Sequence, residues 1–323
     1  MKTLTTAGLG LLAIVLAAAS LTIGEAGLDL SDPTGIFVIT EIRLPRVLMA
    51  VAVAISVSAS TALLQLALRN QIAEPALFGL TAFAGAGALV GLGLGLGFGT
   101  LGAWPLAVAA SLLGLAPIAI IAQRAEISSN RASSRLRNHL PIIGVSVGAI
   151  AIALVGLASA ASPDMRLRSI AIWAFGTLSL QTLSGATLAL ALAVGFLILT
   201  LGFSSSLQKL ALGPSLLRGL GLPIRRLFLL TFGLTGVFAA TSAFGTGSIA
   251  FVGLLAVSIG RIIYGSKLRR LLLGSSLIAL VVILACDLLA RTLASPVELP
   301  IGLFTALIGA PILIWTLTRG TRV

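Results

Sequence analysis

The chain has 323 residues, of which 58% are hydrophobic and 9% are charged, and its mean hydropathy is +1.15. Soluble domains carry about 25% charged residues, so this composition excludes a soluble fold and indicates an integral membrane protein. The net charge of +12 does not predict nucleic-acid binding. The basic residues are divided among loops that flank apolar runs, and they form no single aromatic-bearing patch.

The apolar runs dominate the sequence, and charged residues fall in the short intervals between them. Runs of about twenty residues match the thickness of a bilayer core. They are apolar on every face, whereas strands of transmembrane barrels alternate apolar and polar residues. We therefore predict an all-α polytopic membrane protein with one domain, residues 1–323, and about ten transmembrane helices. The predicted spans are 4–24, 47–68, 76–98, 103–122, 140–161, 183–203, 227–244, 249–259, 271–290 and 301–318.

Lysine and arginine predict the orientation of these spans. Of the 21 basic residues, sixteen fall on one side and five on the other. The positive-inside rule places the more basic side, and with it both termini, in the cytoplasm. Residues 1–20 also resemble a signal peptide, but removing them would leave an odd number of spans, so we take them as a retained first helix. The five basic residues of the opposite side are Arg43, Arg46, Arg166, Arg168 and Arg291.

Residue types suited to catalysis or metal binding are scarce. The chain has one histidine, His139, and one cysteine, Cys286, and neither has the neighbouring ligands that a metal site needs. Asp287 is the one acid inside an apolar run, so the ingredients of an intramembrane enzyme are missing. No G-x-x-x-x-G-K-[ST] phosphate loop occurs, so the chain is not expected to hydrolyse ATP itself. We predict no metal and no cofactor in this chain.

Several glycine patterns resemble enzyme motifs but are better explained by helix packing. Residues 144–148 match a nucleophile elbow and residues 97–102 a dinucleotide fingerprint, but neither lies in the strand–turn–helix context that those motifs require. Glycines four residues apart instead lie on one helix face and permit close crossings. The glycines with this spacing are the pair Gly144 and Gly148 and the series Gly87, Gly91, Gly95 and Gly99.

A family resemblance runs over nearly the whole chain. Its segments are EIRLPR at 41–46, RNQIAEPALFG at 69–79, ALGPSLLRGLGLP at 211–223, FVGL at 251–254 and DLLARTLASPVELPIGLFTALIGAPILIW at 287–315. In this order they resemble the FecCD-type permeases of ABC importers for iron-siderophores, haem and vitamin B12. The resemblance implies a ten-helix permease in the bacterial cytoplasmic (inner) membrane that dimerises around a central pathway. It also implies two ATP-binding subunits, which would hold ATP and Mg, and an extracytoplasmic substrate-binding protein.

Three arginines on the predicted outer face are candidates for docking that binding protein. Arg43 and Arg46 flank Pro45, and charge-assisted pairs with carboxylates make good docking contacts. The resemblance adds Arg291, because similar permeases present these three positions to acidic residues of the binding protein. The alternative for Arg43 and Arg46 is plain anchoring, and the alternative for Arg291 is a pair with Asp287, one turn earlier on the same helix.

The segment 211–223 is too short and too interrupted to cross a bilayer. It is predicted to form one or two short cytoplasmic helices broken at glycines, and it resembles the coupling segment that such permeases insert into a cleft on the ATPase. Rigid short helices there can convert ATPase closure into a displacement of whole spans. The candidate coupling residues are Leu212, Gly213, Pro214, Ser215, Leu216, Leu217, Arg218, Gly219, Leu220 and Gly221.

Some positions depart from the family pattern. Relatives usually carry an acid and an alanine where Pro214 and Leu217 stand, and a proline–histidine pair at residues 257–258. Such drift favours a heterodimer, in which a second, different permease preserves the feature, over a homodimer. The resemblance also makes Ser146 and Thr305 candidates for lining the pathway.

The cargo is the least specified part of the prediction. No charge lies in the middle of any span, which argues against a gradient-driven secondary transporter that relays protons or ions. A pathway without fixed charge suits a large chelated cargo. A ferric siderophore is favoured, with haem or vitamin B12 as alternatives.

Overall fold

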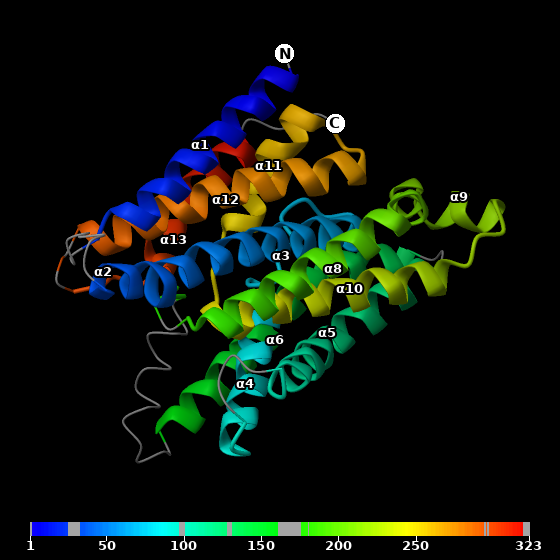
Figure 1. The fold of residues 1–323 in the computed structure, drawn as a ribbon. Helices are drawn as coiled ribbons and strands as arrows, with labels where there is room; N and C mark the ends of the chain where they lie inside the picture. Colours follow the sequence, from blue (N-terminus) through cyan, green and yellow to red (C-terminus); the bar gives the residue numbers. More distant parts are fainter. Residues whose placement is uncertain are drawn as a thin grey trace.

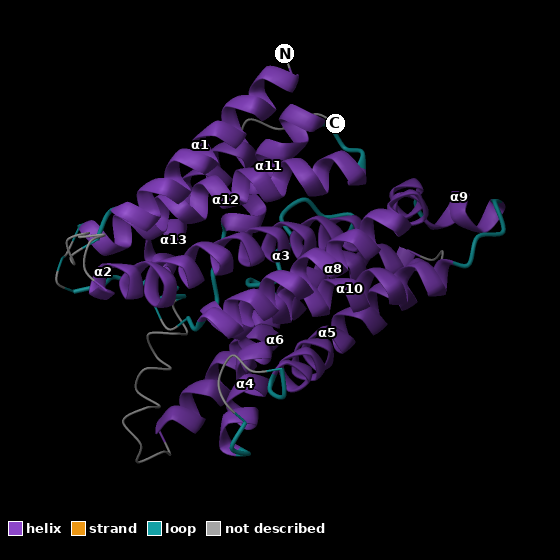
Figure 2. Ribbon diagram, viewed as in Figure 1, coloured by secondary structure: helices purple, strands orange, loops and turns teal. Residues whose placement is uncertain are grey.

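The computed structural model describes residues 2–24, 33–96, 101–127, 131–160, 176–179, 181–293, 295 and 297–318. These residues form helices, turns and loops without any strand, so the all-α prediction is confirmed (Figure 2). The helices are α1 (Lys2–Thr22), α2 (Pro33–Phe37), the π-helix η1 (Val38–Arg43), α3 (Leu44–Leu68), α4 (Leu80–Gly93), α5 (Trp104–Ile127), α6 (Arg131–Ala160), α8 (Leu183–Gln208), the 3₁₀ helix η3 (Lys209–Leu212), α9 (Pro214–Gly219), α10 (Ile224–Thr246), α11 (Val252–Tyr264), α12 (Leu268–Thr292) and α13 (Ile301–Thr318).

Each of the ten predicted spans overlaps a helix. Six helical stretches of the described chain are long and apolar enough to cross a membrane. Four others contain shorter apolar helices, at Leu80–Gly91, Ile142–Ala153, Val252–Tyr264 and Ile301–Ile312. Together they agree with a multi-pass membrane protein, while the side on which the termini lie stays a prediction.

Helix boundaries differ from the prediction where backbone geometry or buried polar groups intervene. Helix α11 begins after Phe251, whose φ of 68° is left-handed, and it ends at Gly265, whose φ is 80°. The predicted span 249–259 is therefore displaced toward the C-terminus. Helix α4 begins four residues late, because residues 70–79 form turns, and α6 begins nine residues early, inside a predicted basic loop. Hydropathy alone registers neither the turns nor the helical basic segment.

Helix α3 occupies the centre of the molecule, between α12 on one side and α8 and α10 on the other (Figure 1). In the most apolar window of the stretch that contains α3, 83% of the residues are buried, whereas in that of α1 the share is 11%. Small residues let neighbouring backbones approach α3, and its serine hydroxyls bond within the helix. Ser58 Oγ donates to the Ala54 carbonyl at 2.6 Å and Ser60 Oγ to the Ser56 carbonyl at 2.8 Å. The central helix is thus a packing hub whose serines are largely satisfied internally.

Several of the glycines four residues apart mark close crossings, but Gly95 does not, because it follows the end of α4 at φ 79° and a Cβ there would meet nothing within 4 Å. A Cβ on Gly87 would lie 2.3 Å from the Leu106 carbonyl oxygen, which leaves no room for a side chain where α4 meets α5. A Cβ on Gly144 would lie 2.1 Å from the Phe78 ring, where α6 meets the turns before α4. The packing explanation is therefore confirmed at these positions. Gly99 and most of the 97–102 pattern lie outside the described residues.

Candidate transport and coupling sites

One end of α3 carries an arginine cluster, defined here as Arg43, Arg46, Asp287, Arg291 and Glu298. Arg46 Nη2 donates to Asp287 Oδ1 at 3.1 Å and also pairs with Glu298. Arg291 Nε lies 3.2 Å from Asp287 Oδ2, so the pairing with the acid one turn earlier is present. Two carboxylates thus balance two guanidinium groups and join α3, α12 and the loop before α13.

The same cluster holds the end of α1. Arg43 Nη1 donates to the carbonyls of Leu21 and Thr22, each at 2.9 Å, and Arg291 Nη2 donates to Ser20 Oγ at 2.8 Å. The last carbonyls of a helix have no partners within it and carry partial negative charge. The two arginines therefore act as a cap for α1.

The structure brings all three predicted docking arginines together, but it points them into the protein. Arg43 is 3% exposed and Arg46 is 6% exposed. Burying a guanidinium is costly unless it is paired and hydrogen-bonded, and the cluster provides those partners. The structure thus shows these arginines joining helices, and their part in docking stays a prediction. Arg166 and Arg168 lie outside the described residues.

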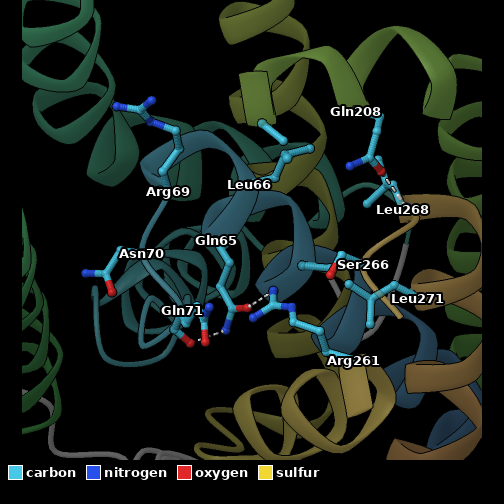
Figure 3. A pocket seen from close by; sticks show the side chains of 12 residues that line it. Gln65, Leu66, Arg69, Asn70, Gln71, Gln208, Arg261, Ser266, Leu268 and Leu271 are labelled. Carbon is cyan, nitrogen blue, oxygen red and sulfur yellow. Dashed lines mark hydrogen bonds between the residues drawn. The ribbon is translucent and has the colours of Figure 1, made fainter. Parts of the chain in front are cut away.

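At the opposite end of α3, a polar cavity of about 470 Å³ opens beside the predicted coupling segment. Gln65 is central to it: its Oε1 accepts from Arg261 Nη2 at 2.8 Å, and its Nε2 donates to the Gln71 carbonyl at 2.6 Å (Figure 3). Across the cavity, Gln208 Oε1 accepts from the Leu268 backbone N–H at 2.6 Å. None of the described residues that line the cavity is acidic. Its amide groups connect α3 and α8 with the α11–α12 turn.

The predicted coupling segment forms two short helices, η3 and α9, separated by Gly213 at φ 83°. A Cβ on Gly213 would lie 2.5 Å from Arg69 Nη1, so the segment contacts the residue that ends α3. Leu217 is 1% exposed and belongs to the apolar core, whereas Leu212, Leu216 and Leu220 are 47%, 57% and 63% exposed. One leucine anchors the segment and three face outward. Arg218 lies in the last turn of α9, and Gly221, at φ 64°, follows it.

The two predicted pathway residues differ in their surroundings. Ser146 is exposed on α6, and its Oγ donates to the Ile142 carbonyl at 2.9 Å. Thr305, on α13, is 2% exposed and donates to the Gly302 carbonyl at 3.1 Å. Both hydroxyls therefore bond to their own helices, as hydroxyls in spans commonly do.

Sequence reasoning missed the position of Glu74. It lies in the interval between the predicted spans 47–68 and 76–98, but it is fully buried, and its Oε1 accepts from the Leu254 backbone N–H at 3.4 Å. The carboxylate therefore lies at the start of α11, where a helix favours negative charge. The sequence feature that could have marked Glu74 is its position. It lies beside Pro75, between two apolar runs, in one of the segments that resemble the family.

Comparison with known proteins identifies the class. The FecCD transport family matches residues 5–319, so the chain belongs to this family of membrane permeases. It is 32% identical over 283 residues to the hemin transport system permease protein HmuU of Yersinia pestis, covering 86% of this chain and 82% of the relative. It is 30% identical over 294 residues to a probable iron chelatin transport system permease of Helicobacter pylori, covering 87% and 82%.

Two further similarities extend over nearly the full length. The chain is 32% identical over 323 residues to the vitamin B12 import system permease protein BtuC of Salmonella newport, covering 97% of this chain and 94% of the relative. It also matches a solved structure described as a metal-chelate type ABC transporter in an inward-facing conformation. That match has a TM-score of 0.80 and 26% identity, and it covers 97% and 98% of the two chains.

Proposed function

We propose that this chain is the permease subunit of an ATP-driven importer whose cargo is a ferric siderophore. Family membership and relatives whose names specify hemin, iron chelatin and vitamin B12 support an importer of metal-containing chelates. The observation that carries the ATP-driven part is the η3–α9 segment, whose helix α9 projects from one end of the bundle (Figure 1). Three leucines of this segment are exposed.

The coupling step follows from the anatomy of this segment. Leu212, Leu216 and Leu220 enter a cleft on the ATPase, because exposed apolar groups on a water-facing segment favour a protein partner. Leu217 fixes the segment to the core. Arg69, which lies against Gly213, carries its displacement to the end of α3. A rigid-body displacement of α3 and the helices packed on it then opens the pathway alternately to each side.

Cargo is delivered at the arginine cluster. Carboxylates of an extracytoplasmic binding protein compete with Glu298, whose side chain is 33% exposed, for Arg46 and the neighbouring Arg291. In this exchange one charge-assisted pair replaces another, so the guanidinium groups never remain buried without a partner. Because the arginines of the cluster also hold the end of α1 and pair with Asp287 on α12, docking would shift the positions of these two helices.

Composition of the complex tests the assembly. We expect gentle purification through a tag on this chain, followed by mass spectrometry, to recover two ATP-binding subunits with a second, different permease. Recovery of an ATPase with this permease alone would favour a homodimer. Reproducible absence of any ATPase would contradict the importer and favour a gradient-driven transporter or a structural scaffold.

Uptake assays test the cargo. Cells that express the system should accumulate radiolabelled iron from a ferric siderophore in an ATP-dependent manner. Preferential accumulation of haem or vitamin B12 would replace the siderophore without changing the class of transporter. A Walker-lysine substitution in the partner ATPase is the control for ATP dependence.

A further inference from the structure

An apolar groove of about 260 Å³ lies between α5 and α10, away from both regions described above. Helices α5 and α10 run antiparallel along the groove, and the distance between them differs from one end to the other. At one end the helices touch, since a Cβ on Gly236 would lie 2.5 Å from Leu112 Cδ2. Toward the other end the helices leave space, and a Cβ on Gly233 would meet nothing within 4 Å. The helices are therefore in close contact at Leu112 and Gly236, and the groove leaves open space beside Gly233. Its lining residues are Leu112, Leu115, Ala116, Ala119, Ile120, Gln123, Phe228, Leu229, Phe232 and Gly233.

A polar lining residue and a basic residue lie toward the end of the groove opposite Leu112. Gln123 is the one polar side chain of the lining, and its Nε2 is shielded from water with no hydrogen-bond partner among the described residues. A buried donor without an acceptor is energetically unfavourable, so this amide is suited to an acceptor that a ligand supplies. Arg225 lies exposed on α10 one turn before Leu229, on the same helix face. Because Leu112 lies level with Gly236 on antiparallel helices, Gln123 lies level with Arg225.

The length of the groove matches one membrane leaflet. From Leu112 to Gln123 is eleven helical residues, or about 16 Å along the axis. Half of a bilayer hydrocarbon core is about 15 Å. An acyl chain that enters at Gln123 would therefore end near the Leu112–Gly236 contact, and its headgroup would lie at the level of the basic residues.

We propose that this groove binds one anionic phospholipid. Its acyl chain fills the space beside Gly233, the Gln123 amide donates to an ester carbonyl, and Arg225 pairs with the phosphate. Negative lipid charge fits this end of the chain, because α9 and the first turn of α10 carry Arg218, Arg225 and Arg226 and no acid. The bound lipid contacts both α5 and α10, and α10 is the helix that follows the η3–α9 segment in the chain.

Native mass spectrometry of the full chain, purified with the subunits that accompany it, tests the site. We expect wild type to retain one dioleoylphosphatidylglycerol in preference to dioleoylphosphatidylcholine. Gly233→Leu should lower this retention about tenfold, since a leucine side chain occupies the groove. Arg225→Gln should reduce the preference for phosphatidylglycerol about fivefold, because one basic residue near a membrane surface contributes on the order of that factor.

Two matched variants serve as controls. Gly195→Leu places the same side chain on α8, where a Cβ also meets nothing within 4 Å, and it should leave retention unchanged. Arg226→Gln removes an equal charge about 100° around α10 and should preserve most of the preference. Leucine favours helix relative to glycine, and a Cβ on Gly233 meets nothing within 4 Å, so we expect Gly233→Leu to keep α10 folded.

A photoreactive residue at Leu229, which is 58% exposed in the groove, separates the lipid from a protein occupant. A phosphatidylglycerol adduct supports the proposal, whereas an adduct with the second permease overturns it. Equal retention of the two lipids by wild type, or wild-type retention in both Gly233→Leu and Arg225→Gln, would also overturn it.

Discussion

The two ends of α3 handle positive charge in opposite ways. At the arginine cluster, Arg46 and Arg291 are matched by Asp287 and Glu298 of the same chain. At the end of α3 beside the predicted coupling segment, called the coupling end here, the cavity beside Gln65 is lined by two arginines and, among the described residues, by no acid. Three leucines there are exposed as well. The first end is closed by internal ion pairs, while the second end exposes apolar side chains and carries basic residues with no acid in the described lining of its cavity.

The largest expected effect comes from breaking the closed end. Asp287→Asn keeps the shape of the side chain but removes the charge that Arg46 and Arg291 share. Removing one partner of a buried ion pair costs about 3–5 kcal/mol, because the remaining charge is left uncompensated. Thermal unfolding of the purified chain, followed by size-exclusion chromatography, should show a strongly lowered midpoint.

Glu298→Gln is the control for that experiment. Its side chain is 33% exposed, whereas that of Asp287 is 1% exposed, so the same loss of charge should cost less than half as much. Equal midpoints for wild type and Asp287→Asn would contradict the closed character of this end.

A smaller effect is expected from the polar network at the coupling end. Gln65→Leu removes the acceptor of Arg261 and the donor to the Gln71 carbonyl, and leaving such groups unpaired costs about 1–3 kcal/mol. The same unfolding assay measures the loss. Gln71→Leu is the control, because its backbone carbonyl still accepts from Gln65. If Gln65→Leu were as stable as this control, the prediction would be wrong, and water would replace the Gln65 amide as the hydrogen-bond partner of Arg261 and of the Gln71 carbonyl.

The contrast between the ends was only partly readable from the sequence. The spans and the broken coupling segment follow from local patterns, namely apolar length and glycine spacing. The partners of Arg46 do not, because Asp287 and Glu298 are 241 and 252 residues away. Hydropathy also left Glu74 in an interval between two predicted spans, because no local pattern encodes a buried carboxylate that lies against the start of α11. Long-range pairing of polar groups therefore required the tertiary structure.

The coupling segment itself offers a sharper test of the open end. Alanine at Gly213 must adopt a φ of 83°, at a cost of about 1–2 kcal/mol, and its Cβ would displace Arg69. We expect Gly213→Ala to retain assembly with the ATPase but to lower substrate uptake per ATP hydrolysed severalfold in proteoliposomes. Gly219→Ala is the control, because Gly219 lies in the same segment but has open space around it and no positive φ. This variant should leave coupling unchanged. Unchanged coupling in Gly213→Ala would remove the contact with Arg69 from the mechanism.

The smallest expected effect is on the affinity of the binding protein for the permease complex. Here removal of a carboxylate should strengthen an interaction, whereas in Asp287→Asn it should lower stability. Glu298→Gln weakens an internal pair of Arg46, so carboxylates of the binding protein would meet less competition. A partly exposed ion pair contributes up to about 1 kcal/mol, so docking to the complex in nanodiscs should tighten by up to about fivefold. Glu41→Gln removes an equal negative charge from an exposed residue that makes no ion pair within the described chain. If both variants tightened docking equally, general electrostatic attraction would explain the result. Tightening by Glu298→Gln alone requires Arg46 to exchange an internal carboxylate for an external one.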